Sequence, residues 1–535
     1  MINNIKFKNN LLIIFFGIFL TLPFIGIILN YSPIPEADFW SIFDRVYRLN
    51  QKDWSTILDQ HNEHRPALSY LISYCDYKFF GGNFYLNYLI TIISYLLSGY
   101  LFYLIFADTV KIDFTNRVYF SVILCLLFFW SQKPNFIFPF HISILWVNLF
   151  SLLVLFFYNR FIVFKKNIYL FLSLLISFLP ILSMVSGIFT LPVLSLFALA
   201  KKRKIEFVLF LFMSIIVCYL YFYNFKLVSA HSNFLEINFE KFLNIYLYFF
   251  GYLGSIFSFM FGKGHFGLTI AIIFGHIFFV LFLWKSWKLI LNKFNSNSDY
   301  LVFFILLVLI NGLLTALGRF EDGILHSISS RYTTNTIFGW SILMILYRSN
   351  FIKFFLTFDN ENKIKKYKFL FFFLLVLMIH NQIKAIFIDY NAEKILLRSE
   401  SLIALTLGIQ GNSSKKIPHL DSSNINLYIN EKLFIFNKGI FESLKNITNK
   451  KLTNIINYFD LTNIEIVPNK KFNYSRISFS IENLEIDKVY FKDDNENIIG
   501  YAISDNNFRL IKKNKKKFIG YYLTSLTFDN VTILY

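Results

Sequence analysis

Long apolar blocks with almost no charge recur along the 535-residue chain. Residues 11–29, 205–225 and 300–318 form three of these blocks. A helix needs about 20 apolar residues to cross the roughly 30 Å of hydrocarbon in a bilayer, and each block has about that length. Hydrophobic residues make up 56% of the chain, and soluble domains contain only about 45 to 50%. The sequence therefore predicts a polytopic α-helical membrane protein, and it excludes a soluble enzyme, a disulfide scaffold, a coiled coil and a disordered chain.

Lysine and arginine gather in the short loops between these blocks. The formal net charge of +19 would favour a nucleic-acid partner if the charges formed one surface stripe. Here the charges are divided among loops, and loops rich in Lys and Arg stay on the cytoplasmic side of a membrane. We therefore expect membrane lipid and no nucleic acid as a partner, and a cytoplasmic position for every basic loop. The basic loops lie near residues 6–8, 111–117, 160–166, 201–204, 285–293 and 348–368.

Apolar blocks and basic loops together predict eleven spans. The spans fall near residues 11–29, 84–106, 118–132, 137–158, 168–186, 188–200, 205–225, 266–284, 300–318, 332–347 and 369–388. Residues 242–261 are also apolar, but if they crossed the membrane, the later basic loops would face outward. We therefore expect 242–261 to be an interfacial or re-entrant helix on the outer face. The loops 30–83 and 319–331 then share the outer side.

The last part of the chain, residues 389–535, has a different composition. Apolar and polar residues alternate in stretches such as 476–481 and 488–491, and turns rich in Asp and Asn separate them. Such alternation is typical of β-strands. We expect residues 1–388 to form a transmembrane catalytic domain and residues 389–535 to form a soluble β-rich or α/β domain on the outer side.

The first outer loop carries the residues best suited to acid–base chemistry. Glu36 and Asp38 follow the first span, and a carboxylate near an apolar boundary can serve as a general base or as a ligand of a divalent metal ion. His61, Glu63, His64 and Arg65 follow about 25 residues later in the same loop and could bind substrate or phosphate. Ordinary solvated loop charges are the alternative interpretation of both groups. The sequence leaves a metal requirement open, and it demands no cofactor.

The second outer loop carries arginines that suit phosphate recognition. Arg319 ends an apolar block, and Arg331 with Tyr332 opens the next one. A guanidinium group at a membrane surface can bind two phosphate oxygens at once. The alternatives are interfacial snorkelling of these side chains and an ion pair with Glu63 or Asp322.

The order of motifs in the first loop resembles the GT-C superfamily, in its protein-mannosyltransferase and aminoarabinose-transferase branch. Glu36 and Asp38 stand at the acidic pair of that branch, residues 52–54 at its Gly-Asp-Trp element, and residues 64–68 at its His-Pro-Pro-Leu element. The likeness covers roughly residues 30–106. Ala37 separates the two acids here, so either can be the catalytic one, and an arginine replaces the first proline of the third element.

The resemblance implies an enzyme of the bacterial inner membrane whose site faces the periplasm. Members of this superfamily move a sugar from a polyprenyl-phosphate donor to an acceptor, which here would be a surface glycan, a lipid or a protein. The resemblance assigns Asp38 or Glu36 as catalytic base of an inverting transfer. Two alternatives remain, an O-antigen-type ligase or polymerase and a non-catalytic transporter or flippase of lipid-linked glycans. Charge inside the spans is sparse, which speaks against the transporter.

Overall fold

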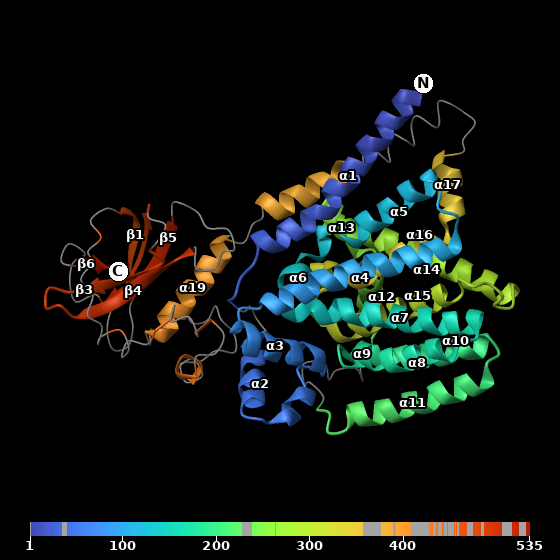
Figure 1. Cartoon of the computed structure of the whole chain (residues 1–535), viewed down its shortest axis with the longest axis horizontal. Helices are drawn as coiled ribbons and strands as arrows, with labels where there is room; N and C mark the ends of the chain where they lie inside the picture. Colours follow the sequence, from blue (N-terminus) through green and yellow to red (C-terminus); the bar gives the residue numbers. More distant parts are fainter. Residues whose placement is uncertain are drawn as a thin grey trace. The chain divides into compact units, whose positions relative to one another are not determined.

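The computed structural model describes most of the chain. The described segments are residues 2–34, 40–226, 238–262, 264–356, 376–388 and 392–407 and, from residue 427 onward, the strands of a sheet with short stretches beside them. The side chains of the first helix are described from Phe16 onward. The chain forms two units (Figure 1). The first contains Met1–Phe24, Ile57–Ser69 and Ile90–Ile388, and the second contains Ile25–Thr56, Tyr70–Leu89 and Asp389–Tyr535.

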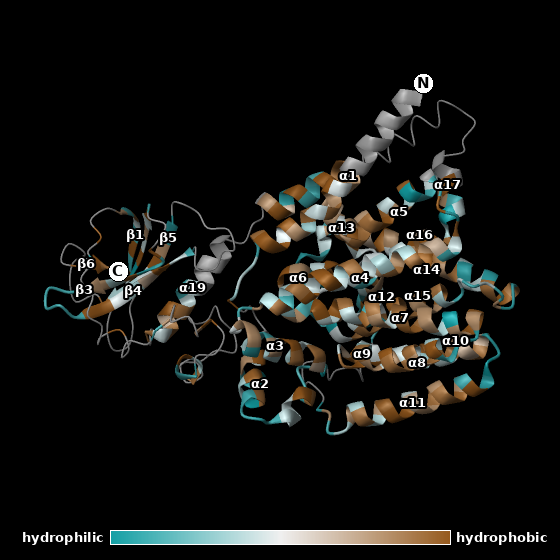
Figure 2. Ribbon diagram, viewed as in Figure 1, coloured by the Kyte–Doolittle hydropathy of each residue, from teal (hydrophilic) through white to brown (hydrophobic). Residues whose placement is uncertain are grey.

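Long apolar helices build the first unit. Among the described residues, 6 helices or helix runs have the length and composition to cross a membrane, or up to 7 if one bent pair counts as a single span. Their helices are α4 (Tyr85–Thr109), α5 (Phe114–Leu127) with α6 (Lys133–Ile137), α7 (Ile142–Phe164), α11 (Lys204–Phe222), α14 (His265–Leu291) and α15 (Tyr300–Arg319). Figure 2 shows hydrophobic residues along α4, α7 and α11. A multi-pass helical membrane protein is thus confirmed.

The prediction of eleven spans is wrong. Several apolar blocks form helices too short to cross a bilayer, since a helix rises about 1.5 Å per residue. The region predicted as two spans, 168–200, forms α8 (Asn167–Ile176), α9 (Phe178–Ile181) and α10 (Thr190–Ala200). Likewise α16 (Thr333–Leu346) has 14 residues, and most of them are buried in protein. Hydropathy alone does not distinguish burial in protein from burial in lipid.

The ends of the remaining blocks are only partly described. Helix α1 (Ile2–Leu29) covers the first predicted span, and α17 (Arg348–Leu356) follows α16. Of the predicted span 369–388, residues 376–388 are described and are helical, and residues 369–375 lie outside the described residues.

Residues 242–261 form a bent pair of helices. Helix α12 (Phe239–Leu253) and helix α13 (Ser255–Phe261) meet at Gly254 with a bend of 72°. A methyl group on Gly254 would lie 1.9 Å from the carbonyl oxygen of Ala271 in α14, so only glycine permits this approach. The bend fits a broken span as well as the predicted re-entrant helix.

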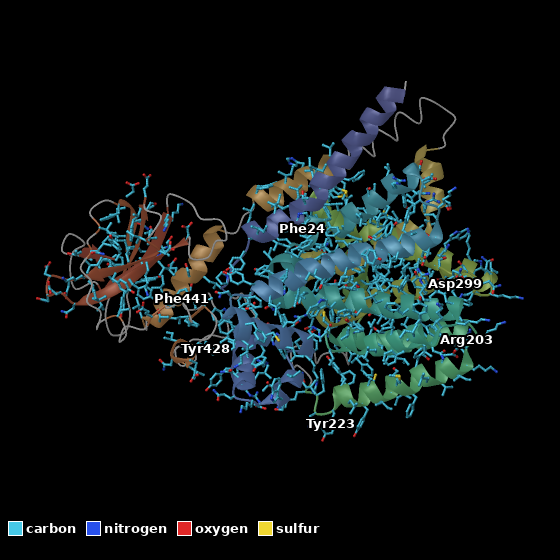
Figure 3. The ribbon with its side chains drawn as sticks, in the orientation of Figure 1. Phe24, Arg203, Tyr223, Asp299, Tyr428 and Phe441 are labelled. Atoms are coloured by element: carbon cyan, nitrogen blue, oxygen red, sulfur yellow. The ribbon has the colours of Figure 1, made fainter. Side chains whose placement is uncertain are left out.

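Basic loops gather at one end of the first unit. Lys201 forms an ion pair with Asp299 at 2.7 Å and also donates to the carbonyl oxygens of Phe294 and Ser296. Figure 3 shows Arg203 and Asp299 at the same end of this unit and Tyr223 at the opposite end. Helices α11 and α15 both start at the basic end and run away from it.

The second unit contains a six-stranded antiparallel sheet in the order β1-β2-β5-β4-β3-β6. Its strands are β1 (Asp460–Val467), β2 (Tyr474–Ile481), β3 (Lys488–Lys492), β4 (Ile498–Ser504), β5 (Lys516–Leu523) and β6 (Thr532–Leu534). Alternate residues of β2 such as Ile477 and Phe479 pack in one apolar cluster. Arg476, which has the opposite parity, binds Glu400 of α19 (Ala392–Thr406) through two hydrogen bonds. The predicted β-rich domain is confirmed in this form.

Part of the first loop also belongs to the second unit. It forms the amphipathic helix α2 (Trp40–Asn50) and most of α3 (Ala67–Phe80). The buried carboxylate of Asp76 in α3 accepts hydrogen bonds from the backbone N–H groups of Phe84 and Leu86, where α4 begins. This contact ties the two helices together at the Gly81-Gly82 turn.

Candidate functional site

The loop that holds Glu63 and the loop that follows Arg319 meet in the first unit. Glu63 and Arg319 are 256 residues apart in sequence, and their side chains form an ion pair at 3.3 Å. The segment around Glu63 is a tight turn, because His61 and His64 exchange two backbone hydrogen bonds of 2.8 and 2.9 Å. The backbone N–H of Leu68 also donates to the carbonyl oxygen of Leu182. This part of the first loop is therefore fixed on the helical unit.

A chain of polar contacts continues from this ion pair through the second loop. After α15 the chain turns through η7 (Phe320–Asp322), η8 (Ile324–Ile328) and η9 (Ser330–Tyr332). Arg319 lies 3.8 Å from Asp322, Asp322 lies 3.5 Å from the Nδ1 atom of His326, and Arg331 donates to the Nε2 atom of His326 at 3.0 Å. We call Glu63, Arg319, Asp322, His326 and Arg331 the charged cluster. Gly323, at φ 91°, allows the turn that folds Asp322 back toward His326.

Two tyrosines complete the surroundings of His326 and Arg331. The hydroxyl group of Tyr248 in α12 lies 3.2 Å from the Nδ1 atom of His326. The hydroxyl group of Tyr332 accepts a hydrogen bond from Arg331 at 3.1 Å, and the Arg331 guanidinium also lies over the Tyr332 ring. Tyr332 was predicted as a site residue and Asp322 only as an ion-pair partner of the arginines, which it is for Arg319. Tyr248 and His326 were not predicted. The four-residue spacing between Asp322 and His326 was the available signal.

The three predicted arginines have different partners. Arg319 is paired with two carboxylates, those of Glu63 and Asp322. Arg65 donates to the backbone carbonyl oxygens of Leu58 and Tyr223, so it ties its loop to the end of α11. Arg331 has no carboxylate within ion-pair distance among the described residues, and its Nε atom is buried without an acceptor there.

The two histidines of the first loop lie close to apolar groups. Protein surrounding the His64 ring lowers its pKa to about 4 through desolvation, with Glu63 opposing the shift and His61 and Arg319 adding to it. His64 is therefore neutral at pH 7, and its Nδ1 atom accepts from the backbone N–H of Val185 at 3.5 Å. His61 meets the ring of Phe140 edge to face. His64 therefore supplies no cation for phosphate binding at pH 7.

The histidine of the second loop is also shifted toward the neutral form. Burial lowers the pKa of His326, the charge of Arg331 lowers it further, and Asp322 opposes the shift. Because Arg331 donates to Nε2, that atom is unprotonated and Nδ1 carries the proton. The proton on Nδ1 faces Tyr248 and Asp322.

The predicted catalytic acids Glu36 and Asp38 lie outside the described residues. In the described part of the chain, no three His, Cys, Asp or Glu side chains are grouped so that they could hold a metal ion.

The site combines charged and neutral polar groups from the two loops. Two ion-paired carboxylates, one doubly paired arginine, one neutral histidine and one arginine without a described counter-ion form a continuous set of contacts between two distant loops. Such a set can orient a polar ligand and can bind an anion.

Comparison of the chain with protein-family models, curated proteins and solved structures finds no match.

Proposed function

We propose that this protein is a membrane glycosyltransferase of the GT-C type. It moves a sugar from a polyprenyl-phosphate donor to a glycan, lipid or protein acceptor on the outer face of the bacterial inner membrane. The observation that carries the proposal is the meeting of the first and second loops in one charged cluster at the end of the helical unit that lies away from the basic loops.

The distance between these two ends matches a membrane. Helix α11 has 19 residues and runs from the basic end to Tyr223, which binds Arg65. Helix α15 has 20 residues and runs from Asp299 to Arg319. Helices of this length extend about 30 Å, the thickness of the hydrocarbon layer. Basic loops favour the cytoplasm, and this supports an outer position for the charged cluster.

The position of charge favours chemistry at a surface over transport through the membrane. The charged residues of the span-length helices lie near the helix ends, as do Lys204 and Glu206 in α11 and Asp108 in α4. Transporters and pumps usually carry ionisable residues within their spans. Here the described charged groups gather at helix ends, where the phosphate and sugar of an amphiphilic donor would lie while its isoprenoid stays in the bilayer.

The proposed reaction is a direct displacement. Asp38 or Glu36 takes the proton from an acceptor hydroxyl group. The hydroxyl oxygen bonds to the anomeric carbon of the sugar while the bond from that carbon to the phosphate oxygen breaks, and the polyprenyl phosphate leaves with the electron pair. Attack from the face opposite the phosphate inverts the anomeric centre. Arginine at the outer surface stabilises the charge on the departing phosphate.

Mass spectrometry of surface glycans tests this proposal. Cells without the gene should lack one sugar residue on a surface glycan, lipid or protein, and the wild-type gene should restore it. Asp38→Asn and Glu36→Gln are the matched variants, and the one that removes the base should lower transfer by about 10² to 10⁴. Full restoration by both variants would eliminate the carboxylate mechanism.

Other outcomes identify the rivals. Loss of a whole glycan, or a change in its chain length, would replace the sugar transferase with a ligase or polymerase. Accumulation of an intact lipid-linked sugar on the cytoplasmic side would replace it with a flippase. Unchanged glycans and unchanged lipid-linked precursors would end the proposal.

A further inference from the structure

Arg331 is the arginine of the charged cluster whose charge is not offset by a described carboxylate. It is half-buried, and its Nε atom has no acceptor among the described residues. Its side-chain hydrogen bonds to described residues go to two neutral groups, His326 and Tyr332. Removing a cation partly from water is unfavourable unless an anion or hydrogen-bond acceptors replace the water. An anionic ligand would supply both.

Buried polar side chains fix the backbone of Arg331. Asn135 of α6 donates to the carbonyl oxygen of Arg331 at 2.9 Å and to the hydroxyl group of Thr334 at 2.6 Å. Thr334 in turn donates to Gln132. All three side chains belong to buried residues. The guanidinium group therefore extends from a fixed position rather than from a solvated loop.

The side chain of Arg331 is held by His326, which has its own support. The Nε2 atom of His326 accepts from Arg331, and the opposite nitrogen faces Asp322 at 3.5 Å and Tyr248 at 3.2 Å. The Tyr248 hydroxyl group that bonds to one ring nitrogen, with the Asp322 carboxylate close to the same nitrogen, favours one tautomer and one orientation of the imidazole. The contacts thus run from Asp322 through His326 to Arg331.

We propose that Asp322 and His326 position the Arg331 guanidinium as the phosphate-binding group of this site. Arg319 and Arg65 are structural by comparison, since Arg319 is neutralised by two carboxylates and Arg65 binds backbone carbonyls. The ligand class is a phosphate monoester or diester. The inference rests on the proposed function in taking a polyprenyl phosphate, rather than free phosphate, as the source of that group.

Binding measurements on the full-length protein in zwitterionic lipid nanodiscs test the assignment. One set of discs contains a polyprenyl monophosphate, and a second set receives inorganic phosphate in solution. Native mass spectrometry measures lipid binding, and calorimetry measures binding of inorganic phosphate. Arg331→Lys should weaken polyprenyl phosphate binding by about tenfold or more, because it removes charge-assisted hydrogen bonds of a planar group.

Two substitutions at His326 distinguish its role in holding the Arg331 side chain from a role in folding. His326→Gln keeps an acceptor near the place of Nε2, so affinity should stay within about threefold of wild type, whereas His326→Leu should weaken binding by about tenfold. Arg160→Lys is the matched control, because Arg160 pairs with Asp108 away from the charged cluster. It should leave phosphate affinity unchanged.

The outcomes are distinct. Equal affinity in wild type, Arg331→Lys and His326→Leu would overturn the assignment, and a His326→Gln variant as weak as His326→Leu would overturn the positioning role. Binding of inorganic phosphate as tight as that of the lipid, with the same dependence on Arg331, would support phosphate recognition but overturn the lipid source. Arg331-dependent lipid binding with unchanged surface glycans would refute the transferase and leave this inference standing.

Discussion

A single residue of the first loop should control part of the pH dependence of folding. The pKa of His64 is about 4 in the folded protein, below its usual 6.5, because the surrounding protein desolvates the ring. The unfolded chain then binds more protons between these two values, so this contribution to stability is complete above about pH 6.5 and is lost as the pH falls toward 4. At pH 4 the loss should reach a few kcal/mol, at about 1.4 kcal/mol per pH unit at most.

Thermal unfolding of the detergent-solubilised protein between pH 7 and pH 4.5 measures this effect. His64→Asn keeps an acceptor for the Val185 N–H but does not titrate, so it should show a smaller fall in unfolding temperature across this range. The same fall in both proteins would assign the pH dependence to other groups.

The residue types of the first loop could be read from the sequence, but the hydrogen-bond partners of Arg65 and His64 could not. These partners are backbone groups, which no side-chain pattern reveals.

At the scale of helices, glycine decides how closely α12 and α14 approach. A methyl group on Gly275 of α14 would lie 1.9 Å from the carbonyl oxygen of Phe250 in α12. Such a contact is far inside van der Waals distance, so Gly275→Ala must push the helices apart and displace Tyr248 with α12. We expect a lower yield of folded protein and an unfolding temperature several degrees lower. Gly17→Ala, which meets no atom within 4 Å, is the control. Equal stability of both variants would contradict this packing.

The same scale shows what a hydropathy pattern can predict. The blocks predicted as spans at 205–225, 266–284 and 300–318 form α11, α14 and α15, which have the length and apolar composition to cross a membrane. Region 168–200 was misread, because Pro180 and Gly187 divide it into short helices. A methyl group on Gly187 would lie 2.0 Å from the Pro180 carbonyl oxygen, which shows how tightly the chain turns there. Tertiary packing of this kind has no signature in mean hydropathy.

For the whole molecule, an error in the number of spans leaves the position of the site intact. The short helices come from 168–200 and from α16. Helix α11 still runs from the basic loop at Lys201 to Tyr223, whose carbonyl oxygen binds Arg65. The chain also passes from Asp299 to the charged cluster through α15. Two helices, α11 and α15, thus separate the basic loops at one end from Arg65 and the charged cluster at the other. The basic loops can be located from the sequence alone, whereas the contact between Glu63 and Arg319 required the folded structure.

Orientation of the molecule in the membrane is therefore testable apart from its chemistry. Reporter fusions after residues 204 and 293 should report the cytoplasm, because Lys and Arg surround both positions. A fusion after residue 325 should report the outer side, since α15 separates it from Asp299 by a length of about one membrane. Fusions after residues 50 and 420 should also report the outer side, and one after 360 the cytoplasm. A cytoplasmic signal at 325 would place the charged cluster beside the basic loops, where a periplasmic sugar donor could not reach Arg331. Agreement at 204, 293 and 325 with a cytoplasmic signal at 420 would instead leave the site in place and move only the β-rich domain.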